Sequence, residues 1–317
     1  MKYVDPFLEH RRAQEAIHLG NADIGLMSSL ITVEFNVTEL CNRVCVFCPR
    51  VDPATYPNRN LNMDVKVVEK AARDLAAIGS SARISFSGFG EALLHRKFLD
   101  IVRAVRAILP GNFIEMNTNG DRLTPEKIRA LMDAGMSALY VNLYDGPEQR
   151  EKFDAMFAAA GVNSYQLRDH WVDSFGLTLN NRSGMVDQPE IGVGPLKEPL
   201  TKPCYYPFYK MLIDWNGDVL FCSNDWGREI IVGNVMRQNI AEIWLGDALF
   251  DIREKLAVGD RRHAPCSGCS VDGTLHGASS FERLKDAKRT MVRRPQSVEP
   301  VTEKVAVAPR VAEGGRG

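Results

Sequence analysis

The 317-residue sequence lacks any unbroken apolar run of about 18 residues, the length that a membrane-spanning helix needs. Residues 1–12 also lack the apolar core of a signal peptide. We therefore expect a cytoplasmic protein without a membrane partner. Thiols stay reduced in the cytoplasm, so disulfides are not expected to hold the fold together.

The sequence also lacks an excess of charge of either sign. It has 39 Lys and Arg residues against 40 Asp and Glu residues, which gives a formal net charge of -1. Surfaces that bind nucleic acids or anionic membranes need a clear excess of positive charge. We therefore predict no nucleic-acid partner and a small-molecule substrate.

What the sequence does have is seven cysteines in clustered patterns, which in a reducing compartment suggest metal binding or catalysis. Three of them, Cys41, Cys45 and Cys48, form a C-x3-C-x2-C run between a β-like segment, residues 31–37, and Pro49. Three thiolates at this spacing can hold three irons of a 4Fe-4S cube and leave the fourth iron open to a substrate. The alternatives are a zinc site, which normally takes four ligands, and three separate core cysteines.

The other four cysteines form a second constellation, Cys204-x12-Gly217-x4-Cys222 followed by Cys266-x2-Cys269. Asn216 and Gly217 are a strong hairpin signal, and a hairpin here would bring Cys222 back toward the segment after Cys204. Four thiolates can ligate a 4Fe-4S cluster completely, but they can equally form a tetrahedral zinc site. Spacing alone leaves both possibilities open.

Helix-like and strand-like patterns alternate along the middle of the chain, which predicts a parallel α/β sheet with right-handed crossovers. The predicted strands are residues 31–37, 83–87, 113–117, 138–144, 165–168 and 177–180. The predicted helices are residues 64–78, 98–109, 124–135, 149–160 and 240–256.

The C-x3-C-x2-C run, with aromatic Phe47 just before its last cysteine, resembles the radical S-adenosylmethionine (radical SAM) superfamily. The resemblance implies a partial (β/α)6 TIM-like barrel and SAM bound to the open iron. It also implies an external reductant, such as flavodoxin or ferredoxin, and a 5'-deoxyadenosyl radical that abstracts hydrogen from a substrate.

The resemblance further implies residues that bind SAM. Ser87-Gly88-Phe89-Gly90-Glu91 follows the second predicted strand and resembles the glycine-glycine-glutamate motif that holds the SAM amino group. The third strand ends in Asn117-Thr-Asn119-Gly120, whose short polar side chains suit ribose hydroxyls, although an ordinary turn has the same composition. The expected cofactor-binding residues are Phe47, Gly88, Gly90, Glu91, Asn117, Asn119 and Arg168.

The second constellation is similar to the auxiliary iron-sulfur region of the SPASM and twitch subfamily. No cysteine follows Cys269, so the shorter twitch form fits better. Dehydrogenases of this subfamily oxidise an aminocyclitol alcohol and pass one electron to the auxiliary 4Fe-4S cluster. This resemblance predicts an oxidoreductase with two 4Fe-4S clusters and a sugar-like or aminocyclitol-like substrate.

The catalytic residues expected from this resemblance are Arg182 and Tyr144. Arg182 would follow the last predicted barrel strand, and a guanidinium can donate several hydrogen bonds to hydroxyl groups. Tyr144, Asp145, Asp169 and His170 lie near strand ends and are the candidates for a base, but no motif distinguishes among them.

Two other functions remain open. Peptide-modifying radical SAM enzymes often carry a leader-binding domain before the barrel, and about 30 residues are too few for such a domain. A non-catalytic iron-sulfur electron-transfer protein would not need the glycine-glutamate and Asn-Thr-Asn-Gly elements.

These patterns predict four regions. They are a helical extension over residues 1–28, a radical SAM partial barrel over 29–190, an auxiliary iron-sulfur domain over 195–280 and a disordered tail over 285–317.

Overall fold

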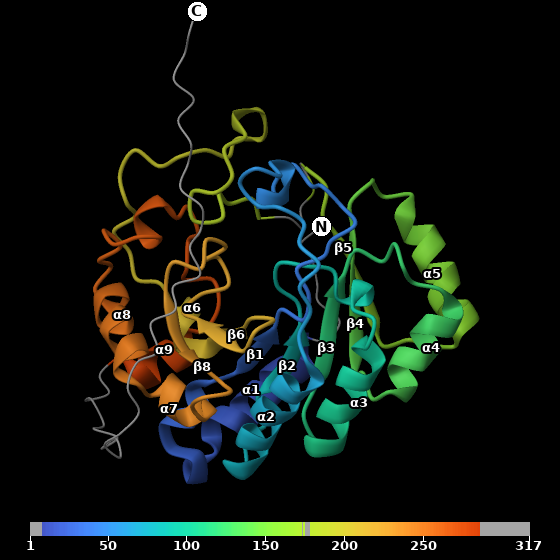
Figure 1. The fold of residues 1–317 in the computed structure, drawn as a ribbon, viewed down its shortest axis with the longest axis horizontal. Helices are drawn as coiled ribbons and strands as arrows, with labels where there is room; N and C mark the ends of the chain where they lie inside the picture. The colour runs from blue at the N-terminus through green and yellow to red at the C-terminus, as the bar shows by residue number, and fades with distance from the viewer. Residues whose placement is uncertain (1–7, 173, 175–177, 286–317) are drawn as a thin grey trace, which may run out of the picture.

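The computed structural model describes residues 8–172, 174 and 178–285. Its centre is one eight-stranded sheet in the order β5-β4-β3-β2-β1-β6-β7-β8 (Figure 1). Every neighbouring pair from β5 to β6 is parallel, and the last two pairs are antiparallel. The strands are β1 Thr32–Phe35, β2 Arg83–Phe86, β3 Ile114–Thr118, β4 Ala138–Leu143, β5 Tyr165–Asp169, β6 Lys210–Ile213, β7 Asp218–Leu220 and β8 Ile231–Asn234.

Helices cover the outer face of the parallel strands, as Figure 1 shows for α2 to α5. Side chains alternate along β2, so Ile84 and Phe86 face the helices while Ser85 faces the opposite side. The helices are α1 Leu8–Gly20, α2 Val65–Ala77, α3 Phe98–Ile108, α4 Pro125–Asp133, α5 Gln149–Ala160, α6 Tyr206–Tyr209, α7 Ile240–Trp244, α8 Asp247–Ala257 and α9 Ala278–Leu284. The 3-10 turns are η1 Ala22–Ser29, η2 Pro49–Val51, η3 Ala92–Leu94, η4 Pro189–Ile191 and η5 Cys266–Gly268.

The first five predicted strands and the first four predicted helices are confirmed with small shifts at their ends. Local signals explain this agreement: Asp64 caps α2, and Thr124 caps α4, which then begins at Pro125. The predicted fold class, a parallel α/β partial barrel, is also confirmed.

The predicted sixth barrel strand, residues 177–180, is wrong where it can be compared. Residue 177 lies outside the described residues, and residues 178–180 are not in a strand. The sixth parallel strand is instead β6, whose apolar Met211–Ile213 stretch pairs with the free edge of β1. Apolar and polar residues alternate over only four positions in residues 177–180, which is too short a stretch to identify a strand.

The predicted helix over residues 240–256 is two helices, α7 and α8, separated at Gly246. A side chain on Gly246 would meet the Glu242 carbonyl oxygen at 2.5 Å, so the chain turns here where only glycine fits. The amphipathic pattern runs through the break because both short helices pack against the same core.

The Asn216-Gly217 hairpin is confirmed between β6 and β7, where Gly217 takes a φ of +87°. Because β6 pairs with β1, the segment that carries the second cysteine set continues the barrel sheet. The four predicted regions stay a prediction, and almost all of the tail over 285–317 lies outside the described residues. Within the described chain, no helix has the length and apolar character that crossing a membrane requires.

Candidate functional site

The carboxyl ends of the parallel strands surround an open cavity of about 190 Å³. Chemistry in parallel α/β folds is normally found at this edge, where the loops after several strands meet. Twelve of the candidate residues from the sequence line this cavity together. They are Cys41, Cys45, Cys48, Phe47, Gly88, Gly90, Glu91, Asn117, Asn119, Tyr144, His170 and Arg182.

The three cysteines after β1 share this cavity, and their burial and closeness disfavour the thiolate form. Burial, together with the nearby Cys48 and Cys41, raises the pKa of the Cys45 thiol to about 12. Three thiolates together therefore need positive charge beside them, which the irons of a cluster would supply. No group of three His, Cys, Asp or Glu side chains in the described chain is placed to hold a single metal ion. In a 4Fe-4S cube each thiolate binds a different iron, so three cysteines leave one iron open, whereas a zinc site normally takes four ligands.

The glycine-rich loop after β2 packs directly against the segment that follows β1, where added side chains would collide. Gly88 has a φ of +129°, and a Cβ there would lie 2.8 Å from the Asn36 Cβ. A Cβ on Gly90 would overlap the carbonyl oxygen of Thr38. Glycine at both positions lets the loop lie directly against residues 36 and 38, and the loop lines the cavity where the SAM-binding prediction places it.

Glu91 joins the loops after β2 and β3. Its buried carboxylate accepts hydrogen bonds from the Asn119 amide and the Thr118 hydroxyl, both at 2.8 Å, and from the Leu93 amide at 3.1 Å. Burial raises the pKa of this carboxyl group. A carboxylate offers about four acceptor positions, so one further donor can still bind.

Arg168, predicted to bind cofactor, does not line the cavity. Its guanidinium donates to Asn117 Oδ1 at 2.6 Å and lies 4.0 Å from the Tyr140 ring centre. In this position Arg168 orients Asn117, which does line the cavity.

Three aromatic rings form one part of the cavity wall. The ring centres of Phe47 and Tyr144 are 6.1 Å apart, and His170 lies edge-on at 5.4 Å from Phe47 and 5.2 Å from Tyr144. Burial, helped by the charges of Arg182 and Arg168, lowers the pKa of His170 to about 4, so its ring is neutral at pH 7. Burial also raises the pKa of the Tyr144 hydroxyl.

Arg182 reaches the cavity from a loop rather than from the end of a strand, and it has a positive φ of 47°. Its Nε atom is buried and makes no hydrogen bond with the described residues. A buried unpaired donor is costly, which indicates a place for a ligand acceptor.

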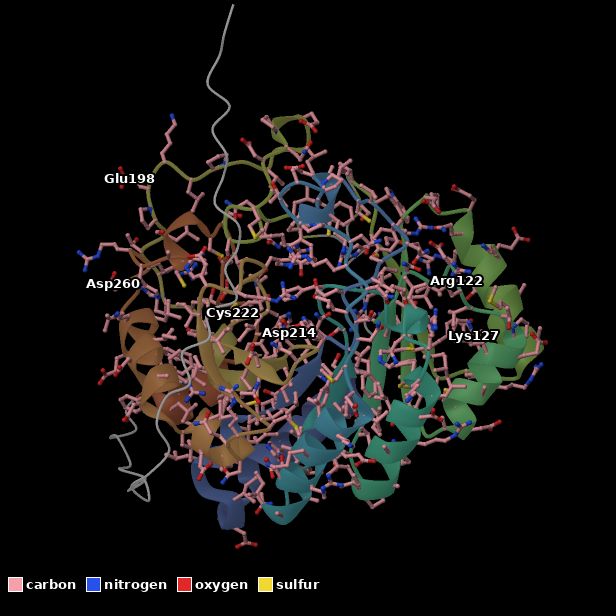
Figure 2. All side chains as sticks on the ribbon, viewed as in Figure 1. Arg122, Lys127, Glu198, Asp214, Cys222 and Asp260 are labelled. Carbon is pink, nitrogen blue, oxygen red and sulfur yellow. The ribbon has the colours of Figure 1, made fainter. Side chains whose placement is uncertain are left out.

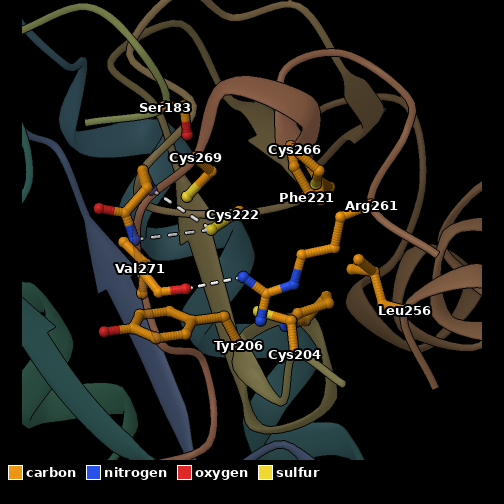
Figure 3. A pocket seen from close by; sticks show the side chains of 12 residues that line it. Ser183, Cys204, Tyr206, Phe221, Cys222, Leu256, Arg261, Cys266, Cys269 and Val271 are labelled. Carbon is orange, nitrogen blue, oxygen red and sulfur yellow. Dashed lines mark hydrogen bonds between the residues drawn. The ribbon is translucent and has the colours of Figure 1, made fainter. Parts of the chain in front are cut away.

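The remaining four cysteines line a second, smaller cavity of about 20 Å³ (Figure 3). Burial and the charges of neighbouring thiols raise the pKa of Cys266 to about 12 and that of Cys222 well above its usual value. The amide of Asn224 donates to the Cys222 sulfur at 3.4 Å. Arg261 holds this site together by donating to the carbonyl groups of residues 202, 203, 271 and 272.

Sequence reasoning missed several residues that shape the open cavity. Arg43 forms ion pairs with Asp121 at 2.6 Å and with Asp145 at 2.7 Å, and so ties the cysteine loop to the loops after β3 and β4. Arg50 donates to the Phe89 carbonyl at 2.9 and 3.0 Å and holds the glycine loop. These arginines carry no sequence signal because their partners are far away along the chain.

Trp226 was also missed. It lines the open cavity and packs on Phe89 with ring centres 4.5 Å apart, although it lies only four residues after Cys222 in the chain. One short segment therefore connects the second cysteine site to the wall of the first.

Two family models match the chain. The model described as the radical SAM superfamily matches residues 35–159, which contain Cys41, Cys45 and Cys48. The model described as SPASM, an iron-sulfur cluster-binding domain, matches residues 204–270, which contain the other four cysteines.

The chain is also similar in sequence and in structure to known proteins. The S-adenosyl-L-methionine-dependent 2-deoxy-scyllo-inosamine dehydrogenase of Niallia circulans is 26% identical over 240 residues, covering 75% of this chain and 92% of the dehydrogenase. The crystal structure of BtrN in complex with AdoMet and 2-DOIA superposes with a TM-score of 0.67 at 24% identity, covering 79% of this chain and 96% of BtrN. The GTP 3',8-cyclase of Klebsiella pneumoniae subsp. pneumoniae is 29% identical, but the match covers only 45% of this chain and 49% of the cyclase.

These matches confirm the predicted fold class, and the two domains imply the predicted cofactors, SAM and 4Fe-4S clusters. The specific roles of individual residues stay predictions.

Proposed function

The chain belongs to the radical SAM superfamily and carries a SPASM domain, and from this premise we propose that it is a dehydrogenase of a small sugar-like or aminocyclitol-like alcohol. When bound, SAM and the first cluster supply a 5'-deoxyadenosyl radical that removes hydrogen from a carbinol carbon, and the second cluster accepts one electron. The observation that carries the proposal is the pairing of a three-cysteine cavity of about 190 Å³ with a four-cysteine site of about 20 Å³. The likeness to an aminocyclitol dehydrogenase supports the substrate class.

In this proposal Cys41, Cys45 and Cys48 hold the first cluster, and Cys204, Cys222, Cys266 and Cys269 hold the second. The glycine loop and Glu91 receive the SAM amino group, which supplies the further donor that the Glu91 carboxylate can still accept. Asn117 and Asn119 bind the ribose hydroxyl groups, Phe47 lies beside the adenine, and Arg168 acts by orienting Asn117.

His170 is the residue that accepts the hydroxyl proton of the substrate. Asp145 is paired with Arg43 and Asp169 is paired with Arg150 at 2.6 Å, so both carboxylates are already engaged. Tyr144 is a poor acceptor because burial keeps its hydroxyl protonated. His170 is neutral, lines the cavity and lies on the same wall as Tyr144. Tyr144 forms the apolar support, and Arg182 binds the substrate hydroxyls through its unpaired donor.

The substrate is a small molecule, and an external flavodoxin or ferredoxin provides the reducing electron. We also assign the protein to the cytoplasm, since seven free cysteines that serve as cluster ligands require reducing conditions during assembly.

The test is a turnover assay of the anaerobically reconstituted full chain with SAM, a reductant and a panel of aminocyclitols and sugars. We expect one 5'-deoxyadenosine for each ketone formed. A substrate deuterated at the reacting carbinol carbon should transfer deuterium to 5'-deoxyadenosine, whereas deuteration at a neighbouring carbon is the matched control. Turnover only with a peptide, or ketone without matching 5'-deoxyadenosine, would contradict the proposal.

A further inference from the structure

A buried charge network connects the half of the chain that carries the second cysteine set to the half that carries the first. The Arg228 guanidinium contacts Asp214 Oδ2 and Glu39 Oε1, both at 2.5 Å, and donates to the Tyr56 hydroxyl at 2.8 Å. Arg228 lies six residues after Cys222, and Glu39 lies two residues before Cys41. Figure 2 places Asp214 and Cys222 in the middle of the molecule, away from its periphery.

Asn36 connects this network to the glycine loop. Its Nδ2 atom donates to Glu39 Oε1 at 2.8 Å and to Asp214 Oδ1 at 2.7 Å. Its Oδ1 atom accepts hydrogen bonds from the backbone amides of Phe89 at 2.9 Å and Gly90 at 3.2 Å. Carboxylate oxygens only accept hydrogen bonds, so the Nδ2 atom of Asn36 must face Glu39 and Asp214. The Oδ1 atom of Asn36 therefore faces the glycine loop.

The two carboxylates depend on Arg228 for compensation. Glu39 is 3% exposed and Asp214 is 1% exposed, so neither charge is stabilised by bulk water. Arg50 also pairs with the Glu39 carboxylate, but at 4.0 Å, and it directs its hydrogen bonds at the backbone carbonyl groups of Glu39 and Phe89. Without Arg228, Asp214 would lose the cation that it contacts and Glu39 would keep only the longer 4.0 Å pair with Arg50, and poorly compensated buried charge is strongly unfavourable.

The backbone conformation of Arg228 indicates that its contacts with Glu39 and Asp214 determine where its side chain lies. It has a φ of 55°, a left-handed conformation that a residue with a side chain rarely adopts. Two hydrogen bonds from the amides of residues 229 and 230 to the buried Asp225 carboxylate hold the turn around it. The surrounding structure therefore fixes Arg228 in an unfavourable backbone conformation that delivers its side chain to Glu39 and Asp214.

We infer that Arg228 is a positioning residue for SAM binding: from the auxiliary half it fixes Glu39 and Asp214, these orient Asn36, and Asn36 sets the glycine loop. The inference rests on the proposed function, in which the Gly88–Glu91 loop binds SAM. It adds that SAM affinity depends on a side chain that lies outside the radical SAM match and within the SPASM match.

The experiment compares the Arg228→Gln variant with wild type as full-length, anaerobically reconstituted holoenzyme. SAM affinity is measured by calorimetry on the oxidised protein, and the signal of the reduced first cluster is recorded by EPR with and without SAM. We expect R228Q to bind SAM about tenfold more weakly, within the usual range of coupling between sites, with unchanged iron content. The conservative R228K variant should recover part of the affinity, because an ammonium group still compensates the two carboxylates.

Arg253→Gln is the matched control. Arg253 is likewise an arginine of the auxiliary half, but it is buried, donates to the carbonyl groups of Pro207 and Trp244 and does not line the open cavity. R253Q should lower the thermal stability and leave the SAM affinity unchanged. If R228Q does not fold, Asp214→Asn removes one of the two carboxylates and should weaken SAM binding in the same direction.

The outcomes separate the inference from the proposed function. If wild type does not bind SAM, the proposed function is wrong. If wild type binds SAM and the R228Q or D214N holoenzyme binds it equally well, the inference alone is overturned. It is also overturned if R253Q weakens SAM binding as much as R228Q does.

Discussion

The two cysteine sites differ in the number of thiols and in the space around them. Cys41, Cys45 and Cys48 share an open cavity of about 190 Å³ with polar side chains from several strand ends, whereas the other four cysteines surround about 20 Å³. Three ligands with space beside them suit a cluster that binds another molecule. Four ligands without that space suit a cluster that only exchanges electrons. This difference assigns substrate chemistry to one site and electron acceptance to the other.

The largest effect is expected when the open site is broken. Cys45→Ala removes one of the three thiolates that would hold the first cluster, so SAM cleavage should fall to background. Iron should fall from about eight to about four per chain, because the second site stays intact. Measured 5'-deoxyadenosine formation checks this prediction, and SAM cleavage by C45A at the wild-type rate would contradict it.

Loss of one ligand from the four-cysteine site should separate SAM cleavage from ketone formation. Cys269→Ala removes one ligand of the proposed electron acceptor, so 5'-deoxyadenosine should still form while ketone falls to background. Both products are measured in the same reaction. Ketone at the wild-type rate would show that the second cluster is not the electron acceptor.

The next prediction tests which residue of the three-cysteine cavity accepts the substrate proton. His170→Asn removes the proposed proton acceptor and should lower ketone formation about 100-fold, the usual scale for a general base. The cavity volume and SAM affinity should change little, and SAM affinity is the control. Equal ketone formation by H170N and wild type would reject this role for His170.

The pH dependence of wild-type ketone formation tests the same residue. A histidine accepts a proton only when neutral, and the pKa of His170 is lowered to about 4 by burial and by Arg182 and Arg168. Ketone formation should therefore stay level as the pH falls through about 6.5, the pKa of an ordinary histidine, and decline only closer to 4. A decline centred near 6.5 that is absent from H170N would contradict the lowered pKa.

The smallest effect is expected at Arg182. Arg182→Gln removes the charge and the unpaired Nε donor, so the KM for the alcohol should rise about tenfold, the cost of one hydrogen bond to a charged group. The KM for SAM should not change. Steady-state kinetics with each substrate varied in turn checks both values, and an equal rise in the two KM values would assign Arg182 a structural role.

The elements that the sequence predicted are those encoded by neighbouring residues. The C-x3-C-x2-C run, the glycine loop before Glu91 and the caps of α2 and α4 depend on short spacing, and all of them lie where expected. The Asn216-Gly217 hairpin also depends only on local turn chemistry.

The features that the sequence did not predict depend on contacts between distant segments. Arg228 meets Glu39 across 189 residues, and Arg50 meets Phe89 across 39 residues. An arginine has no pattern that names such a partner. The sixth parallel strand was misplaced for a similar reason, because the pairing of β6 with β1 joins Thr32 to Lys210, which are far apart along the chain.

The central claim is that the chain holds two 4Fe-4S clusters with different tasks. The most direct test is the iron and acid-labile sulfide content of the full chain after anaerobic reconstitution and desalting. The account predicts about eight of each per chain. About four of each, with zinc at the Cys204, Cys222, Cys266 and Cys269 site, would contradict it by removing the electron acceptor.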